Sequence, residues 1–401
     1  MDASLSQRIN LLAESETLAM SRVSRELSAK GFDVINLSVG EPDFNTPDNI
    51  KAAAIEAIND NFTHYPPVSG IPELRQAICR KFKRDNNLDY KPENIVVSTG
   101  AKQSIYNTIM CLINPGDEVI IPCPYWVSYK EIVKLAEGKA VYIDAPIEQN
   151  FKITPQQLES AITDKTKTII YSSPCNPSGS VYTKNELESL ALVLKKYPDI
   201  FIISDEIYEN IIFSGSHYSI ANFDYLKDRV IIVNGVSKGF AMTGWRLGYI
   251  AAPVFIAKAC DKLQGQVTSG ANSITQKAAV VALDTNPTTS SDIQNMVSAF
   301  KERRDMALKL LNQIPGLITN TPQGAFYILP DVSYYYGKKA ENKIIENGQV
   351  LCDYLLQNYY IALVPGQAFG SPKTVRLSYA TSMAKLIEAI DRLKKGLDNL
   401  K

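Results

Sequence analysis

The alternation of apolar runs with helix-like segments between Asn94 and Ala252 constrains the fold of this chain more than any other feature of its sequence. Apolar runs of strand length lie at residues 95–98, 118–121, 140–143, 168–172 and 200–204. Helical patterns follow the first four of them, at about 102–113, 127–135, 155–162 and 184–196. This succession predicts a mostly parallel sheet that helices cover on both faces. Ligands bind outside the carboxyl ends of the strands in such sheets, so the turns there are the first candidates for a functional site.

Lys238 stands in the most unusual of these turns. It lies between two further apolar runs, 229–233 and 249–253, in a segment with several glycines and Arg246 that is too polar for a core. A lysine held at the end of a strand can lose hydration, which lowers the pKa of its ammonium group and frees a nucleophilic amine. A Schiff base to an aldehyde cofactor needs such an amine. Taken alone, the segment could equally be a surface loop with an ordinary lysine.

Three other turns carry polar residues at predicted strand ends. The small residues of Ser98–Lys102 suit anion binding by backbone N–H groups at a helix N-terminus, although an ordinary turn would look the same. Asn176 lies between two prolines, which would hold its amide in one direction. Asp205 could be a general base, a partner for a ring nitrogen or a metal ligand. Metal is the weakest of the three, because no histidine lies near Asp205 in the sequence.

Composition excludes several classes of function. Lysine plus arginine and aspartate plus glutamate both number 42, so nothing favours nucleic-acid or anionic-membrane partners. Only His64 and His217 are present, so neither a histidine-rich metal centre nor a Ser–His triad is expected. The six cysteines are widely spaced, which predicts free thiols. Since no signal segment and no apolar run of membrane-spanning length occurs, we expect a cytoplasmic protein.

The length of 401 residues allows a large domain and a smaller one. After about Asp284 the chain becomes more polar, with a long helical pattern at 293–314 and strand-like runs at 324–329 and 374–378. We therefore predict three segments: an N-terminal arm with part of the small domain at 1–45, the large domain at 46–284, and the rest of the small domain at 285–401.

Seven motifs follow one another in a familiar order. They are Gly40–Phe44, Tyr65–Arg75, Pro124–Ser128, Asn176–Gly179, Ser204–Tyr208, Ser237–Arg246 and Val375–Tyr379. Together they resemble the class I pyridoxal-phosphate-dependent aminotransferases, most closely the bacterial aspartate aminotransferase branch, over nearly the whole chain. The resemblance implies the α/β fold of fold type I, in which a large domain with a mostly parallel central sheet adjoins a small α/β domain. Cys175 and Ser178 depart from the commoner Asn and Thr of their loop, but neither is expected to touch the cofactor.

The resemblance also implies a role for each matching residue at a pyridoxal 5′-phosphate site. Lys238 would form an aldimine with the cofactor aldehyde and then move the substrate α-proton, with no metal involved. Asp205 would hold the ring nitrogen protonated, while Tyr208 and Asn176 would hydrogen-bond the phenolic oxygen. Trp126 would stack on the ring. The phosphate would be held by Gly100, Ala101, Lys102, Ser237 and Arg246, and by Tyr65 of a second subunit.

For the substrate, the resemblance implies that Arg376 grips the α-carboxylate with help from Gly40, and that Lys102 binds a distal carboxylate, with Trp126 and Asn176 close by. The contribution of Tyr65 would make the protein a homodimer with shared active sites. Each residue also has a plainer explanation. Trp126 could be packing, Arg376 a buried structural ion pair, and Tyr65 a turn residue.

The expected function is transfer of the amino group of L-aspartate to 2-oxoglutarate, which gives oxaloacetate and L-glutamate. One alternative is an aminotransferase that favours prephenate or aromatic and neutral amino acids. A second is a β-carbon–sulfur lyase of the same fold, and a third is a non-catalytic cofactor-binding module attached to a regulator.

Overall fold

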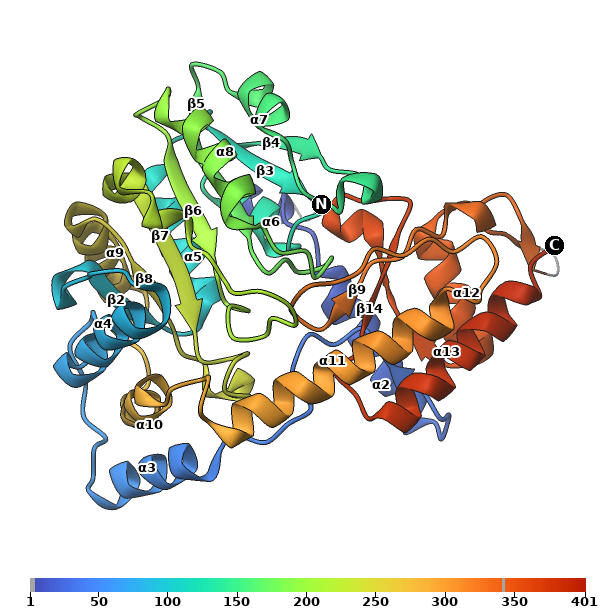
Figure 1. The fold of residues 1–401 in the computed structure, drawn as a ribbon, viewed down its shortest axis with the longest axis horizontal. Helices are drawn as coiled ribbons and strands as arrows, with labels where there is room; N and C mark the ends of the chain where they lie inside the picture. The colour runs from blue at the N-terminus through green and yellow to red at the C-terminus, as the bar shows by residue number, and fades with distance from the viewer. Residues whose placement is uncertain (1–3, 341–342) are drawn as a thin grey trace.

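The computed structural model describes residues 4–340 and 343–401 of the chain. The larger half is built on seven strands: β2 (Ile95–Ser98), β3 (Glu118–Cys123), β4 (Lys139–Asp144), β5 (Thr166–Ser172), β6 (Phe201–Asp205), β7 (Val230–Gly235) and β8 (Gly248–Ala251). They form one sheet in the order β2-β8-β7-β6-β5-β3-β4 (Figure 1). All neighbours in it are parallel except β8, which runs antiparallel to β2 and β7. The predicted α/β fold with a mostly parallel central sheet is therefore confirmed.

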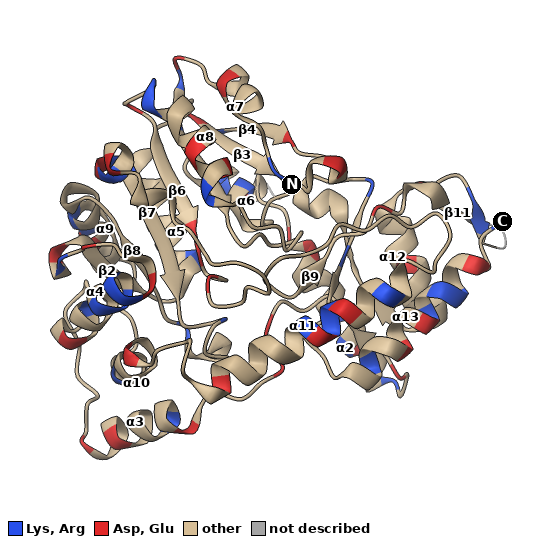
Figure 2. Ribbon diagram, in the orientation of Figure 1, with Lys and Arg blue, Asp and Glu red and all other residues tan. Residues whose placement is uncertain are grey.

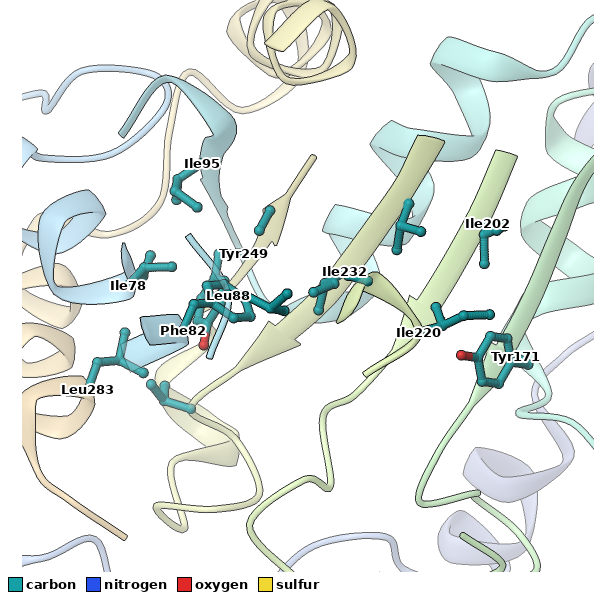
Figure 3. Packing of buried hydrophobic residues seen from close by; sticks show 14 of the residues in the cluster. Ile78, Phe82, Leu88, Ile95, Tyr171, Ile202, Ile220, Ile232, Tyr249 and Leu283 are labelled. Carbon is teal, nitrogen blue, oxygen red and sulfur yellow. The ribbon is translucent and has the colours of Figure 1, made fainter. Parts of the chain in front are cut away.

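Successive residues of the central strands point to opposite faces of the sheet, and each face has its own core. Ile202 packs in the core that contains Phe82 and Leu187, whereas Ile203 packs in the core that contains Ile109. Figure 3 shows side chains of the first of these cores, contributed by strands and by neighbouring segments. Because both faces are buried, the strands read in the sequence as continuous Ile and Val runs without a polar alternation.

Helices cover both faces of this sheet. They are α3 (Asp48–Asn59), α4 (Pro72–Asn86), α5 (Ala101–Leu112), α6 (Ser128–Leu135), α7 (Pro155–Ala161), α8 (Lys184–Lys195), α9 (Val254–Val267) and α10 (Ser273–Asp284). The sequence pattern did not reveal α9 and α10. Helix α10 packs against both α3 and α4, so its apolar residues do not form a single stripe. Among the described helices, none is both long and apolar enough to cross a membrane.

A second core joins the two ends of the chain. The elements in and beside it are α2 (Glu16–Ala29), β1 (Ile35–Asn36), α11 (Ser291–Leu311), β9 (Tyr327–Ile328), β10 (Lys339–Ala340), β11 (Lys343–Ile344), α12 (Gly348–Tyr359), β12 (Ile361–Ala362), β13 (Val364–Pro365), β14 (Val375–Ser378) and α13 (Met383–Asp398). Helix α1 (Gln7–Asn10) buries no residue and adds nothing to this core. Met20 and Leu37 pack here with Phe300, Leu351 and Leu393. This packing favours a small domain built from both termini, although the boundaries at 45 and 284 stay a prediction.

The short strands of this second core differ from their predicted lengths. The pattern of residues 31–38 also predicts a strand, but only β1 forms there, and it pairs in parallel with β12. The run at 324–329 forms only β9 in the antiparallel sheet β13-β14-β9. Each of these two strands has only two paired residues. Beyond these pairs the runs are irregular: residues 31–33 are exposed, while Leu37 and Phe326 still form backbone hydrogen bonds with Ala362 and Tyr379, respectively.

Acidic and basic side chains are intermixed over the outer helices (Figure 2). On α13 they form pairs one turn apart, such as Lys395 with Asp391 at 2.7 Å. Such exposed pairs each contribute only a few tenths of a kcal/mol, about 0.3–0.5 kcal/mol.

Candidate active site

One pocket lies where the carboxyl ends of the central strands meet the second core, and it encloses about 240 Å³. All the residues predicted for the site line it except Gly100 and Tyr65. The sheet side contributes Ala101, Lys102, Trp126, Asn176, Asp205, Tyr208, Ser237, Lys238 and Arg246, and the other side contributes Gly40 and Arg376. Tyr65 is 94% exposed and does not line the pocket of its own chain. Its predicted role across a dimer interface stays a prediction.

Lys238 follows β7 and reaches across the pocket to the other side. Its Nζ donates a hydrogen bond to the carbonyl oxygen of Gly40 at 2.6 Å and lies 5.8 Å from the centre of the Tyr208 ring. Burial lowers the pKa of Lys238 to about 8; Glu41 opposes the shift, and Arg246 and Arg376 add to it. A much larger share of this amine is therefore uncharged at neutral pH than of an ordinary lysine, as a nucleophile requires.

Asp205 ends β6 and is almost fully buried. Its Oδ2 accepts a hydrogen bond from Tyr129 Oη at 2.7 Å, and its Oδ1 accepts one from the backbone N–H of Ile207 at 3.3 Å. Burial raises the pKa of Asp205 to about 6, even though both hydrogen bonds stabilise the carboxylate. A cation placed against this group, such as a protonated ring nitrogen, would therefore gain from a charge that is already in place and poorly hydrated.

The raised pKa of Asp205 has a consequence for stability. From the ordinary value of 3.8 up to about 6, the folded chain binds more protons at this residue than the unfolded chain, so the free energy of unfolding falls as pH rises. At pH 7 the burial of the charge then destabilises the cofactor-free chain by up to roughly 3 kcal/mol, at about 1.4 kcal/mol per pKa unit.

We therefore expect Asp205→Asn to stabilise the cofactor-free chain at pH 7 and to change its stability little at pH 4.5. Thermal unfolding at the two pH values measures this. Asp164→Asn, at an exposed position, is the control and should show no such pH-dependent gain. An equal effect of Asp205→Asn at both pH values would contradict the expectation.

Arg376 lies on β14 and is 2% exposed. Its Nη1 donates to Asn176 Oδ1 at 2.9 Å, its Nη2 donates to the Ser38 carbonyl at 2.5 Å, and its guanidinium lies 4.7 Å from the Tyr327 ring centre. Among the described residues, its Nε has no hydrogen-bond partner and no carboxylate forms an ion pair with it. A buried cation with an unused donor is unfavourable unless an anion binds it.

A second candidate site for an anion lies at the start of α5. Gly100 has a φ of 83°, and a Cβ there would lie 2.3 Å from Arg246 Nη2. A Cβ on Gly248 would lie 2.2 Å from the backbone nitrogen of Ala101. The absence of side chains thus lets Arg246 and the backbone of β8 come close to the N-terminus of α5, where N–H groups and the helix dipole favour a phosphate. Lys102 is exposed beside it, with its Nζ 5.0 Å from the Trp126 ring centre.

Sequence reasoning missed several residues of the pocket. Tyr129 carries the Asp205 hydrogen bond, and Tyr327 Oη lies 2.8 Å from Tyr208 Oη. Tyr129 comes directly after the motif that contains Trp126, and Tyr327 lies within a predicted strand. Both residues are therefore next to or inside a recognised sequence pattern, but that pattern does not predict a role for them in the site. Further lining residues that were not predicted are Ser15, Thr17, Leu18, Val127, Ser128, Ser172, Ile207 and Thr243.

Comparisons with known proteins agree on one family. A family model described as aminotransferase class I and II matches residues 33–393. The bifunctional aspartate aminotransferase and glutamate/aspartate-prephenate aminotransferase of Petunia hybrida is 46% identical, over 100% of this chain and 84% of the relative. The aspartate/prephenate aminotransferase of Nitrosomonas europaea is 47% identical, over 97% of this chain and 98% of the relative.

Solved structures give the same result. The aspartate aminotransferase of Rhizobium meliloti superposes with a TM-score of 0.95 at 41% identity, covering 99% of this chain and 100% of its own. The Thermus thermophilus aspartate aminotransferase with maleate superposes with a TM-score of 0.92 at 38% identity, covering 98% of this chain and 99% of its own.

Proposed function

Because the chain belongs to the family of class I and II aminotransferases, we propose that it transfers the amino group of L-aspartate to 2-oxoglutarate, with pyridoxal 5′-phosphate in the pocket. The observation that carries the proposal is that the pocket holds two cations besides Lys238 and Arg246, namely Arg376 in its interior and Lys102 in its exposed part. Aspartate, glutamate and their oxo acids each carry two carboxylates, whereas neutral substrates have only one. Maleate, seen with the Thermus thermophilus relative, is also a dicarboxylate.

The residues of the pocket fit this cofactor group by group. The start of α5, with Ser237 and Arg246 beside it, suits the phosphate, because Gly100 and Gly248 leave room for a close backbone approach. The buried Asp205 suits a protonated pyridine nitrogen. Other residues are proposed to bind the phenolic oxygen (Tyr208, Asn176), the ring face (Trp126) and the aldehyde (Lys238). When bound, the cofactor supplies an electron-accepting ring that stabilises negative charge at the substrate α-carbon.

The chain itself would supply orientation and proton transfer. Arg376 would bind the α-carboxylate and so would hold the α-hydrogen toward the proton-carrying amine. Lys238 Nζ would take the proton from the α-carbon, since its lowered pKa keeps part of the amine uncharged at neutral pH. Asp205 would stay ionised against the ring nitrogen, helped by Tyr129.

We expect Lys102→Ala to reduce turnover of aspartate and glutamate by an amount typical of one lost charged hydrogen bond, roughly 1.5–3 kcal/mol in kcat/KM. Alanine and tyrosine should be affected far less, because they have no distal carboxylate. Steady-state assays with these four donors and 2-oxoglutarate measure the difference. An equal loss for all four donors would mean that Lys102 serves the phosphate, and the acidic-substrate proposal would lose its residue.

The same assays separate the alternatives. Prephenate tested as an amino acceptor examines the activity that several relatives are named for. With an added donor that carries sulfur on its β-carbon, such as L-cystathionine, release of pyruvate, ammonia and a thiol without formation of L-glutamate would instead indicate the lyase chemistry.

We also propose that the enzyme is a homodimer and that Tyr65 completes the partner's phosphate site. The exposed position of Tyr65, outside its own pocket, supports this. Mixing Tyr65→Ala chains with Lys238→Ala chains should restore some activity, since one site of each hybrid then carries neither change. A fully active monomer in light scattering would refute the proposal.

The six free cysteines favour a reducing compartment such as the cytoplasm.

A further inference from the structure

A second group of charges lies behind the turn that carries two of the proposed catalytic residues. Within residues 205–209, Asp205 and Tyr208 line the pocket, whereas Glu206 and Glu209 do not. Both glutamates are buried, Glu206 at 0% and Glu209 at 8% exposure. One short turn therefore presents three side chains to the pocket, those of Asp205, Ile207 and Tyr208, and two carboxylates to the protein interior.

Each of these carboxylates is held by several donors. Glu209 is ion-paired with Lys81 of α4 and accepts hydrogen bonds from Asn234 Nδ2 at 2.7 Å and Asn86 Nδ2 at 3.0 Å. Glu206 accepts from Ser219 Oγ at 2.6 Å, from Ser204 Oγ at 2.9 Å and from His217 Nε2 at 2.9 Å. The donors come from β6, β7, α4 and the loop that follows the turn, so the turn is tied to most of its surroundings.

The charges in this cluster balance only if His217 is protonated. Lys81, which is 2% exposed, can neutralise one of the two buried carboxylates but not both. Among the described residues that contact these carboxylates, the imidazole of His217 is the remaining group that can carry a positive charge, and its Nε2 lies 2.9 Å from Glu206 Oε2. The other titratable groups near the cluster are the Asp205 carboxyl group, whose raised pKa includes repulsion by Glu206, and the phenols of Tyr90, Tyr171 and Tyr249, whose raised pKa values leave them uncharged at neutral pH.

The pKa of His217 reflects the same surrounding charges. Burial lowers it, but attraction by Glu206 and Glu209 outweighs burial, and the pKa lies above the usual 6.5 despite the repulsion of Lys81. Attraction to Lys81 keeps the pKa of Glu209 below its ordinary value despite burial, so that this carboxylate is charged. Glu206, Glu209 and His217 place their ligand atoms within 4.8 Å of one another, as a metal site would, but the Lys81 ammonium already binds Glu209.

We propose that Lys81, Glu206, Glu209 and His217 form a positioning cluster that fixes Asp205 and Tyr208 from behind, with His217 as an imidazolium at neutral pH. The inference deepens the proposed function and rests on it, because the fixed residues are those proposed to bind the cofactor ring. These four residues act through the turn and touch neither substrate nor cofactor. Loss of the His217 proton would leave a net negative charge buried one residue away from the carboxylate of Asp205.

The direction of the pH effect follows from the raised pKa of His217. Its contribution to stability is complete below about pH 6.5 and is lost as pH rises through the pKa of the folded state. Cofactor binding should weaken over the same range, since the turn then carries an unbalanced charge.

The charge state can be measured without the cofactor. The chain has only two histidines, so in the full-length protein labelled with ¹³C at histidine Cε1, NMR should show two imidazole signals, assigned with His64→Gln. The His217 signal should remain that of an imidazolium at pH 7, and Glu206→Gln should lower its titration midpoint. A neutral His217 at pH 7 would overturn the proposal.

The positioning role is tested with pyridoxamine 5′-phosphate, which needs no covalent bond to Lys238. His217→Gln keeps a hydrogen-bond donor for Glu206 but removes the positive charge. In the cofactor-free chain it should raise the dissociation constant for pyridoxamine 5′-phosphate about tenfold at pH 7, a typical size for coupling between sites. The dissociation constants of the variant and of the wild type should become equal above the pH at which His217 of the wild type loses its proton. A variant that stays folded and shows the wild-type constant at every pH would overturn the proposal.

Lys81→Met leaves an unbalanced carboxylate and could prevent folding, so it is paired with a compensating change. Lys81→Met with Glu209→Gln removes one charge of each sign and should recover most of the affinity lost in Lys81→Met. Lys196→Met is the matched control, because it breaks an exposed ion pair with Glu159 and should leave the constant unchanged. Failure of the wild-type chain to bind pyridoxamine 5′-phosphate would count against the proposed function, while the imidazole titration would still decide the charge of the cluster.

Discussion

Replacing Lys238 by alanine is expected to leave a folded chain that binds pyridoxal 5′-phosphate but exchanges substrate α-protons at least 10²–10⁴-fold more slowly, roughly the contribution of a positioned acid–base group. The reason is that the substitution removes the pocket amine whose pKa is lowered by burial and which lies 2.6 Å from the Gly40 carbonyl oxygen. Exchange of the α-hydrogen of aspartate for deuterium, followed by NMR, measures the loss directly and does not depend on later steps.

The wild-type chain provides the complementary measurement. Borohydride should fix the cofactor covalently to Lys238, which peptide mapping would identify. Lys165→Ala, at an exposed lysine away from the pocket, should exchange α-protons at the wild-type rate. A colourless wild-type protein, or a label on another lysine, would show that the proposed mechanism is wrong.

Replacing Arg376 by lysine should reduce kcat/KM for every amino donor by about 2–5 kcal/mol, as found when one partner of a buried, hydrogen-bonded charge pair is truncated. Lysine keeps the positive charge but cannot reproduce the planar fork that holds Asn176 and the Ser38 carbonyl while leaving Nε for a carboxylate. Unlike the Lys102 variant, this one should lose alanine and aspartate turnover alike, since both substrates carry an α-carboxylate.

A control variant, Arg229→Lys, tests whether the loss of kcat/KM in Arg376→Lys comes from a destabilised fold. Arg229 is also largely buried and donates only to backbone carbonyls, those of Leu194, Tyr197 and Ile200, far from the pocket lining. Arg229→Lys should lower the unfolding temperature without changing the ranking of substrates. If Arg376→Lys changed stability in the same way and left kcat/KM intact, Arg376 would be a structural residue.

The sequence predicted the central sheet because its strands are buried on both faces. Runs such as that containing Ile202 and Ile203 need apolar residues at every position, and this leaves a strong local signal. Strand β1 was predicted over residues 31–38 but is much shorter, because only two of its residues pair, with β12, more than three hundred residues later in the chain. Helix α10 was missed for a related reason, since its several packing partners remove the single apolar stripe.

In the site too, the sequence predicts what depends on neighbouring residues and does not predict contacts between residues far apart in the chain. Lys238 and Asp205 could be singled out from their positions at strand ends, whereas Arg376 and Gly40 gained roles only from the resemblance. The hydrogen bond of Tyr129 to Asp205 joins residues 76 positions apart, and nothing local predicts it. Likewise, the charge of His217 depends on Lys81, Glu206 and Glu209, which only the folded chain brings together.

The missing side chains at Gly40, Gly100 and Gly248 bear on how this enzyme could be redesigned. At each of them a Cβ would lie within 2.6 Å of another atom: the Tyr327 hydroxyl, the Arg246 guanidinium or the Ala101 backbone nitrogen, respectively. A mutant library aimed at new amino donors should therefore leave these three codons fixed. Randomising Ser15, Thr17 and Leu18 should give more folded variants, because these residues line the same pocket and none of them is fully buried.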